Sequence, residues 1–335
     1  MTKPVAWGVL GVARIASAKV IPAMQRGALS QIVAIASRDA ARAADAAAAL
    51  GLAKSYGSYE ELLADPEIEA VYNPLPNHLH VPWTIRAMEA GKHVLCEKPV
   101  ALTADEARQL IAVRDRTGLQ VAEAFMVRHH PQWLRARALV RAGRIGEIRA
   151  IQTFFSYYND DAGNIRNQAD IGGGALYDIG CYALVTARFL FEADPLRLIA
   201  TMDRDPAMQV DRLTSALVEF PGGRHLTFTC STQASPHQRV TVVGTMGRIE
   251  IDIPFNADPL ARSRIRIDDG RDLAGGGLVV EDLELCDQYT LQGDAFSRAV
   301  RGEASLDFPI EDAVMNLRLI DCLFRSTVSG RWEAP

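Results

Sequence analysis

Residues 5–16 read VAWGVLGVARIA, and this stretch decides the fold class predicted for the first third of the chain. Its first half is an apolar run with β-branched and aromatic residues, which is typical of a buried strand. Gly11 follows the run, and residues 14–27 then have the composition of a helix. An apolar strand that ends at a glycine and leads into a helix predicts the first half of a β–α–β unit.

The same alternation continues to about residue 123. The apolar run IVAIAS (32–37) leads into DAARAADAAAAL (39–50), whose alanines strongly favour a helix. Further strands are predicted over 68–73, 92–96 and 119–123, and further helices over 58–64, 79–90 and 103–117. Strands that alternate with helices over short links predict a parallel sheet with right-handed crossovers.

The pattern changes after about residue 125. Strand signals crowd together here, separated by turn sequences such as PGGR (221–224) and GTMGR (244–248). The remaining elements are predicted as a strand over 148–158 and helices over 131–142, 173–191, 288–301 and 310–328. We therefore predict an α/β protein with two domains, a parallel-sheet domain over residues 1–125 and an α+β domain with a large, mostly antiparallel open sheet over residues 126–335.

Composition and charge narrow the classes of function. The length of 335 residues suits two domains, and 48% hydrophobic with 23% charged residues is ordinary for a globular protein. The net charge of −5 comes without any basic block, which argues against nucleic acid or an anionic membrane as the main partner. No apolar stretch reaches the roughly 18 residues of a membrane span, and the N-terminus lacks a signal-peptide pattern. We therefore expect a cytoplasmic protein.

The cysteines and histidines predict neither a disulfide framework nor a metal site. The five cysteines are widely spaced without a CxxC pair, which favours a reducing compartment. His129 and His130 are adjacent, so their side chains do not converge on a regular element, and no third ligand is spaced nearby.

The loop after the first strand carries a dinucleotide-binding pattern. Read from Gly11, the residues form a G-x-A-x-x-A variant of the glycine fingerprint, with Ala13 and Ala16 at the later positions. The first glycine makes the tight turn, the second position lets the backbone approach the pyrophosphate, and the third lets helix and strand pack. The helix N-terminus then offers N–H groups to the phosphates. The alternative is a plain tight turn.

The end of the second strand bears on the choice of dinucleotide. It reads Ala36-Ser37-Arg38-Asp39. An acidic residue here usually binds the ribose 2′-hydroxyl of NAD, whereas an arginine suits the 2′-phosphate of NADP. Ser37 and Arg38 can bind that phosphate, and Asp39 is interpreted as the N-cap of the following helix. NADP is therefore favoured over NAD. The alternative is that Arg38 is only a solvated surface charge.

Three further motifs carry a resemblance to a known family. They are NPLPNHLH (73–80), KHVLCEKP (92–99) and GGGALYDIGCY (172–182), which follow the glycine loop in this order. Together they resemble the glucose–fructose oxidoreductase/inositol dehydrogenase (Gfo/Idh/MocA) family over most of the chain. The resemblance implies a Rossmann domain, and then an α+β domain whose open sheet joins copies of the chain into a dimer or tetramer.

The resemblance also implies hydride transfer between a nicotinamide cofactor and a sugar or polyol carbon. The cofactor contacts carried over by matching positions are Gly11, Ala13, Arg14, Ile15, Ser37, Arg38, Leu75, Pro76, Asn77, His80, Glu97 and Lys98. Ala13 and Ala16 depart from the family's usual glycines, but both are small enough to serve. Substrate contacts are predicted at Arg128, Arg166, Asp178 and Tyr289.

The predicted catalytic residues are Lys98, Asp178 and Tyr182. Lys98 matches the family's catalytic lysine, and Asp178 with Tyr182 matches its D-x-x-x-H/Y pair, in the form that resembles the glucose–fructose oxidoreductase, dihydrodiol dehydrogenase and NADP-linked xylose dehydrogenase branch. A free tyrosine has a pKa of about 10, and a nearby lysine cation lowers such a pKa, so Lys98 and Tyr182 would form an acid/base pair. On a regular helix Asp178 and Tyr182 would share one face.

Each of these side chains also has a simpler interpretation. Asp178 could be a capping carboxylate and Tyr182 an ordinary packed aromatic, while Cys181 and Cys96 are interpreted as packing. The favoured function is an NADP-dependent oxidation of aldose C1 to a lactone, or sugar-to-sugar exchange on a retained cofactor. The alternatives are a dehydrogenase of trans-dihydrodiols or other carbonyls and diols, and a non-catalytic NADP-binding sugar sensor.

Overall fold

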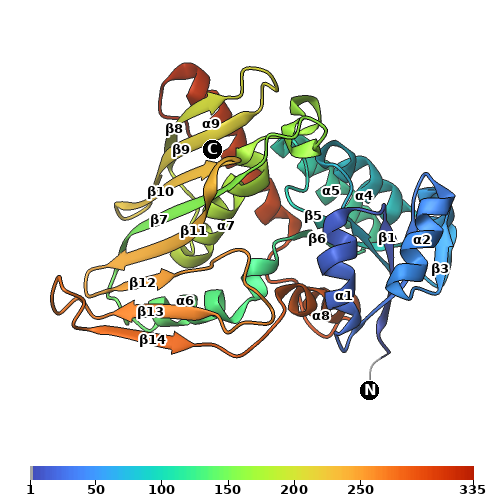
Figure 1. Ribbon diagram of the computed structural model, residues 1–335, viewed down its shortest axis with the longest axis horizontal. Helices are drawn as coiled ribbons and strands as arrows, with labels where there is room; N and C mark the ends of the chain where they lie inside the picture. Colours follow the sequence, from blue (N-terminus) through green and yellow to red (C-terminus); the bar gives the residue numbers. More distant parts are fainter. Residues whose placement is uncertain (1–2) are drawn as a thin grey trace. The chain divides into compact units, whose positions relative to one another are not determined.

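The computed structural model describes residues 3–335, which divide into two compact units (Figure 1). The first unit contains the chain up to Met126 together with Asp287–Leu317. The second contains Val127–Cys286 together with Arg318–Pro335. The sequence predicts a single boundary at residues 125/126 and places everything after it in the second domain. In the structure, residues 287–317 instead belong to the first unit.

A six-stranded parallel sheet forms the centre of the first unit, as predicted. Its strands are β1 (Val5–Leu10), β2 (Ser30–Ala36), β3 (Lys54–Tyr56), β4 (Ala70–Asn73), β5 (His93–Glu97) and β6 (Val121–Ala124). Their order is β3-β2-β1-β4-β5-β6. The sequence does not predict β3, because its three residues KSY show no apolar run.

Helices connect these strands, and several begin at a side-chain cap. They are η1 (Ala16–Val20) continued by α1 (Ile21–Gln25), α2 (Ala40–Leu50), α3 (Tyr59–Ala64), η2 (Asn77–Leu79) continued by α4 (His80–Glu89), and α5 (Ala104–Thr117). The carboxylate of Asp39 accepts hydrogen bonds from the backbone N–H groups of Ala41 and Arg42, which confirms its predicted role as an N-cap. Ser58 and Thr103 cap α3 and α5 in the same way.

Helix α8 (Gln288–Val300) completes the core of the first unit. It packs against α1 and β2. Trp7 of β1 is fully buried, its ring lies 5.3 Å from that of Phe296, and its indole N–H donates to the Ser297 hydroxyl at 3.3 Å. A large aromatic pair of this kind explains why the helix belongs to this unit, since its removal would expose the middle of β1.

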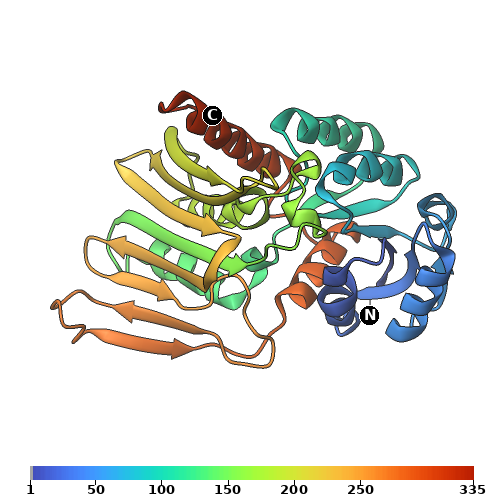
Figure 2. The ribbon, with the colours of Figure 1, turned by 45° about the horizontal axis from the view of Figure 1, so that its top comes forward.

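The second unit is an eight-stranded sheet with helices on one face (Figures 1 and 2). Its strands are β7 (Ile148–Tyr158), β8 (Arg197–Arg204), β9 (Asp211–Phe220), β10 (Arg224–Ser231), β11 (Gln233–Gly244), β12 (Arg248–Ile251), β13 (Arg264–Asp268) and β14 (Leu278–Asp282). The order is β14-β13-β12-β11-β7-β10-β9-β8, and only the β7–β10 pair is parallel. The mostly antiparallel sheet confirms the predicted architecture.

The covering helices are α6 (Pro131–Arg141) and α7 (Cys181–Phe191), with the end of α9 (Ile310–Ser329). Helix α7 is apolar on nearly every side, and all but one of its residues are buried. A helix of this composition is stable only inside a protein. It therefore fixes the position of the glycine-led segment that precedes it.

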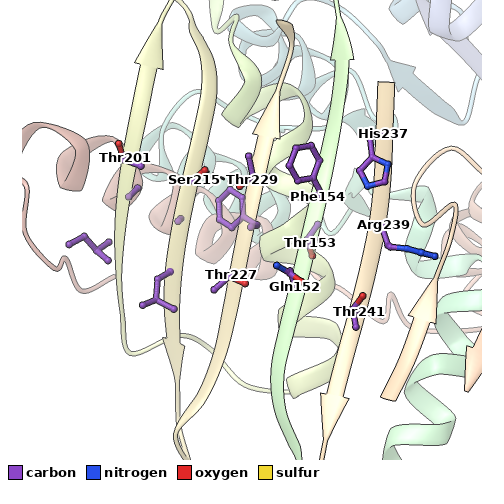
Figure 3. Close-up of a pocket in the computed structure, with 15 residues that line it drawn as sticks. Gln152, Thr153, Phe154, Thr201, Ser215, Thr227, Thr229, His237, Arg239 and Thr241 are labelled. Carbon is purple, nitrogen blue, oxygen red and sulfur yellow. Dashed lines mark hydrogen bonds between the residues drawn. The ribbon is translucent and has the colours of Figure 1, made fainter. Parts of the chain in front are cut away.

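Within the described part of the second unit, no helix covers the opposite face of the sheet (Figure 2). This face is hollowed by a cavity of about 630 Å³ whose lining includes Gln152, Phe154, Thr201, Thr227, His237 and Arg239 (Figure 3). Figure 3 shows these labelled side chains projecting from strands β7, β8, β10 and β11, on the face turned away from the helices behind.

Among residues 3–335, no helix is both long and apolar enough to cross a lipid bilayer. In the same range the structure shows no cluster of three His, Cys, Asp or Glu side chains suited to hold a metal ion.

Candidate active site

The predicted cofactor contacts of the first unit follow four neighbouring strands of one sheet. Gly11 follows β1, Ser37 follows β2, Leu75 follows β4, and Lys98 follows β5. The strand order reverses between β1 and β4. Open parallel sheets bind ligands outside the carboxyl ends of their strands at such a reversal. The predicted residues therefore gather at the edge where a dinucleotide would bind.

The glycine loop has the geometry that its sequence predicts. Gly11 has φ of +84°, and its N–H donates to the carbonyl of Ala36 at 2.8 Å. A Cβ at Gly11 would lie 2.9 Å from Cδ2 of Leu75, so a side chain would fill the space between the two loops. This bare backbone beside a helix start fits the pyrophosphate of a dinucleotide. Sequence reasoning missed Arg42, whose guanidinium donates to the carbonyl of Val12 at 3.0 Å.

The end of β2 presents one hydroxyl and one cation. The Ser37 hydroxyl accepts a hydrogen bond from the Asp39 N–H at 3.2 Å, and the Arg38 side chain is exposed. Asp39 is engaged as a helix cap. Beside Arg38 stands the buried Tyr59, whose pKa is raised by burial and lowered in part by the arginine charge. The ring of Trp83 meets Tyr59 edge-on at 4.7 Å, which agrees with a packing role for Trp83.

His80 connects two of the loops. It is buried, Nδ1 lies 2.7 Å from the carbonyl of Pro99, and Nε2 lies 2.6 Å from that of Leu75. Burial lowers the pKa of His80 to about 4, so the ring is neutral and can donate to only one of these carbonyls. A contact of His80 with the cofactor stays a prediction. Its contacts with Leu75 and Pro99 show that the ring links the loops after β4 and β5.

The E-K-P motif lies among tyrosines. The Tyr72 hydroxyl donates to Oε1 of Glu97 at 2.5 Å, and the Lys98 N–H donates to the other carboxylate oxygen at 3.3 Å. Burial and the Glu97 charge raise the pKa of Tyr289, and the Lys98 charge lowers it in part. Tyr289 therefore lies near Glu97 and Lys98. Tyr72, which holds Glu97, was missed because it lies within a buried strand.

In the second unit, the segment Gly172–Tyr182 is not the regular helix that its sequence predicts. A π-helical turn, η6 (Leu176–Gly180), precedes α7. Such turns bond residue i to i+5 and occur often at functional sites. Asp178 lies inside the π-turn and Tyr182 lies after it, so the rule that residues four apart share a face does not apply between them.

The glycines of this segment are required by close backbone contacts. The N–H of Gly173 donates to the carbonyl of Gln168 at 2.9 Å, and that of Gly174 to the carbonyl of Arg166 at 2.8 Å. A Cβ at Gly173 would lie 2.6 Å from the Arg166 oxygen. Because no side chain fits there, the loop that carries Arg166 packs directly on the start of the segment Gly172–Tyr182.

Tyr157 and Arg166 both contact Oδ2 of Asp178. It accepts a hydrogen bond from the Tyr157 hydroxyl at 2.5 Å and forms an ion pair with Nε of Arg166 at 3.0 Å. Its interpretation as a helix cap is wrong, because Asp178 lies inside the π-turn and the N-cap position is Ala175. Arg166, a predicted substrate contact, lies against the predicted catalytic carboxylate. Sequence reasoning missed Tyr157, which is 21 residues from Asp178.

The Tyr182 ring is fixed in an aromatic cluster. It is 5% exposed, meets Phe155 edge-on at 5.9 Å, and lies 5.2 Å from the ring of Phe255. Phe255 in turn stacks on Trp133. Such packing leaves the ring little freedom and determines the direction of its hydroxyl.

Other residues singled out in the sequence are buried or have a structural contact. Cys181 and Cys96 are fully buried, and burial raises the pKa of Cys96 well above its usual value, in keeping with packing. His130 caps α6, since its Nδ1 accepts from the N–H of Gln132. Arg128 is buried, at 6% exposure, in the turn η3 (Met126–His129). Its substrate contact stays a prediction.

Two family models match this chain. Residues 5–125 match the oxidoreductase family with an NAD-binding Rossmann fold, and residues 133–250 match the GFO/IDH/MocA C-terminal domain. The chain belongs to the GFO/IDH/MocA oxidoreductase family. The resemblance that the four sequence motifs predict is thereby confirmed, and the first unit of this GFO/IDH/MocA protein is its dinucleotide-binding domain.

Three relatives of known sequence or structure extend the comparison. The chain is 49% identical to an uncharacterized oxidoreductase of Rhizobium meliloti, over 98% of both chains. It is 38% identical to D-xylose 1-dehydrogenase (NADP(+)) 2 of Haloferax volcanii, over 97% of this chain and 98% of the relative. A 3-ketoreductase from Actinomadura kijaniata, solved with NADP and TDP-benzene, superposes with a TM-score of 0.90 at 31% identity, covering 97% and 98% of the two chains.

Proposed function

We propose that this protein is an NADP-dependent sugar oxidoreductase that oxidises C1 of an aldose to a lactone. The relative from Haloferax volcanii, named as an NADP-dependent xylose dehydrogenase, supports the substrate class and the cofactor. Ser37 and the exposed Arg38 support the 2′-phosphate, because Asp39 is engaged as a helix cap and an arginine suits a phosphate. Dihydrodiol dehydrogenases of Bos taurus and Mus musculus are more distant relatives, and they define the main alternative.

The observation that carries the proposal is the segment Gly172–Tyr182. In it, Asp178 is bound by the side chains of Tyr157 and Arg166, and the ring of Tyr182 packs against that of Phe255. The nicotinamide cofactor, when bound, would accept the hydride from the sugar carbon. Tyr182 takes the proton of the substrate hydroxyl, and Lys98 stabilises the negative charge that develops on oxygen. Asp178 accepts a hydrogen bond from a substrate hydroxyl, and Tyr157 and Arg166 fix the direction of that carboxylate.

The test begins with the cofactor. The purified protein is denatured, and any released nucleotide is identified. NADP or NADPH supports the proposal, and its release from protein purified without added cofactor also supports exchange on a retained cofactor. Turnover is then followed by the absorbance of the reduced cofactor with xylose, glucose, a trans-dihydrodiol and a nucleotide-linked keto sugar. Turnover of the dihydrodiol alone would overturn the sugar assignment. NADP binding without turnover of any substrate would favour the sensor.

Two substitutions test the assigned roles. Lys98→Met and Tyr182→Phe should each lower kcat by about a hundredfold or more, with the affinity for NADP retained in Tyr182→Phe. The matched controls are Lys19→Met and Tyr158→Phe, at exposed positions, which should retain activity. Wild-type kcat in either test variant would remove that residue from the mechanism.

We also propose that copies of this chain associate through the open face of the eight-stranded sheet. Two observations support this association. The face is hollowed by a cavity lined in part by Phe154 and Thr227, and no helix of the described second unit covers it. Thr227→Arg should then lower the mass measured by light scattering to that of one chain. An unchanged oligomer would place the interface elsewhere.

A further inference from the structure

A buried carboxylate outside the predicted catalytic residues contacts the segment Gly172–Tyr182, called the catalytic segment below because it carries Asp178 and Tyr182. Asp211 is the first residue of β9 and is 1% exposed. Its Oδ2 accepts a hydrogen bond from the N–H of Leu176 at 2.7 Å and from the Thr214 hydroxyl at 3.2 Å. A carboxyl group is rarely so buried unless its oxygens are bonded, and here both bonds converge on one oxygen.

Leu176 begins the π-turn that carries Asp178, and the first N–H groups of a helix have no partner inside it. The usual partner is a side chain just before the helix, but the residue in that position is Ala175, which has no capping hydrogen bond. Asp211 supplies the cap from 35 residues further along the chain. The start of the catalytic segment is thus attached to the sheet by a carboxylate.

The glycine before the turn is matched to this carboxylate. Gly174 has φ of +117°, a conformation that other residues rarely adopt. A Cβ there would lie 1.9 Å from Oδ1 of Asp211. At the other end of the turn, a Cβ at Gly180 would lie 2.9 Å from the Cys230 sulfur in β10. The turn is therefore held against the sheet at both ends, with the carboxylate on one side.

We propose that Asp211 is a positioning residue for catalysis, which holds the first turn of the catalytic segment so that Asp178 and Tyr182 keep their reactive placement. The inference rests on the proposed function, in which Asp178 and Tyr182 act on the substrate. Asp211 itself contacts Leu176, Thr214 and Gly174 rather than the reacting atoms, so its effect passes through the backbone.

The titration of Asp211 provides a test of this role, because a purely structural role would not change how kcat depends on pH. Burial raises the pKa of Asp211 to about 7, and the hydrogen bonds from Leu176 and Thr214 together with the charge of Arg204 in β8 oppose this rise. The thiol of Cys230 faces it from β10, and the pKa of that thiol is raised by burial and by the charges of Asp211 and Asp178. The ionised carboxylate is the stronger acceptor for the Leu176 N–H, so the segment is best held above neutral pH.

The experiment compares kcat and KM against pH, from about 5.5 to about 9, for the wild type and variants of the full-length protein. Asp211→Ala should lower kcat by about tenfold while KM for NADP stays within about twofold. Asp211→Asn keeps the size and one acceptor oxygen but cannot titrate. It should retain more activity than Asp211→Ala. The plot of log kcat against pH should show a step near pH 7 for the wild type and no such step for Asp211→Asn.

Thr214→Val removes one of the two hydrogen bonds to the carboxylate and should shift that step to higher pH. Asp203→Asn is the matched control, because Asp203 is an exposed aspartate that pairs with Arg212 on the same sheet. It should behave as the wild type. Gly174→Ala should reproduce the loss of kcat, since its methyl group would displace the carboxylate, and circular dichroism establishes that each variant is folded.

The outcomes separate the two proposals. If Asp178→Asn and Tyr182→Phe keep wild-type kcat, the proposed function fails. If these two lose activity while Asp211→Ala and Asp211→Asn keep both the kcat and the pH profile of the wild type, the proposed function stands and the role of Asp211 is refuted. If Asp211→Ala does not fold, the pH profiles of Asp211→Asn and Thr214→Val decide in the same way.

Discussion

Replacing Asp211 by asparagine should change how the stability of this protein depends on pH. Burial raises the pKa of this carboxyl from 3.8 to about 7 in the folded chain. The folded state therefore binds the proton more tightly than the unfolded state, which exposes the group to water. Between these two pKa values the folded protein is protonated and the unfolded chain is not, so stability falls as pH rises through this range.

The size of the effect follows from the same two values. One pKa unit corresponds to about 1.36 kcal/mol, so the contribution of Asp211 should fall by about 3 kcal/mol between about pH 5 and about pH 8, where the folded group is ionised. Asparagine does not titrate. The free energy of unfolding of Asp211→Asn minus that of the wild type should therefore rise by about 3 kcal/mol over this interval.

Urea unfolding followed by circular dichroism and by tryptophan fluorescence, at several pH values, measures this difference. Agreement of the two signals establishes that one transition is being compared. The difference between variant and wild type is the quantity of interest, because other titrating groups are common to both proteins. A difference that stays constant from pH 5 to pH 8, to within about 0.5 kcal/mol, would falsify the argument for a buried, pH-dependent carboxyl.

Three further predictions test other contacts. Arg38→Ala should lower the preference for NADP, measured as kcat/KM with NADP divided by kcat/KM with NAD, by about tenfold to a hundredfold, because a charge-assisted contact to phosphate is lost. An unchanged ratio would show that Arg38 does not bind the 2′-phosphate. Tyr157→Phe should lower kcat by about tenfold, because Asp178 loses the hydrogen bond from the Tyr157 hydroxyl. Tyr158→Phe is the control, and equal kcat values in the two variants would contradict this. Phe296→Ala should lower the free energy of unfolding by about 3 to 5 kcal/mol, measured by urea titration, and a loss under about 1 kcal/mol would show that α8 adds little to the core.

Apart from the short strand β3, the strands and helices of the first unit could be predicted to within a few residues. Strand and helix signals alternate there, and each boundary has a local cause such as the cap at Asp39 or the turn at Gly11. Strand β7 was likewise predicted at its observed bounds of Ile148–Tyr158. What the sequence could not indicate is that α8 returns to the first sheet, because an amphipathic pattern shows that a helix has a buried face and not which sheet covers it.

The sequence names candidate site residues, which stay predictions, but not the side chains that contact them in the structure. The resemblance of two short motifs to the family predicts the roles of Lys98, Asp178 and Tyr182, because each motif is visible as a local run of residues. Tyr157 and Asp211 act on the same segment from distant strands, and in the sequence each resembles an ordinary strand residue. The π-turn was also missed, since a single turn of altered period is too short to change the hydrophobic pattern.

The assignment of residues 287–317 to the first unit has a consequence for work on isolated parts of this protein. The stretch from Val127 to Cys286 is in effect an insertion between the last strand of the dinucleotide-binding sheet and the helix that finishes its core. A fragment cut after Met126 would leave Trp7 without Phe296 and Ser297. A folded cofactor-binding fragment should instead include α8, with Met126 joined to Asp287 by a flexible linker.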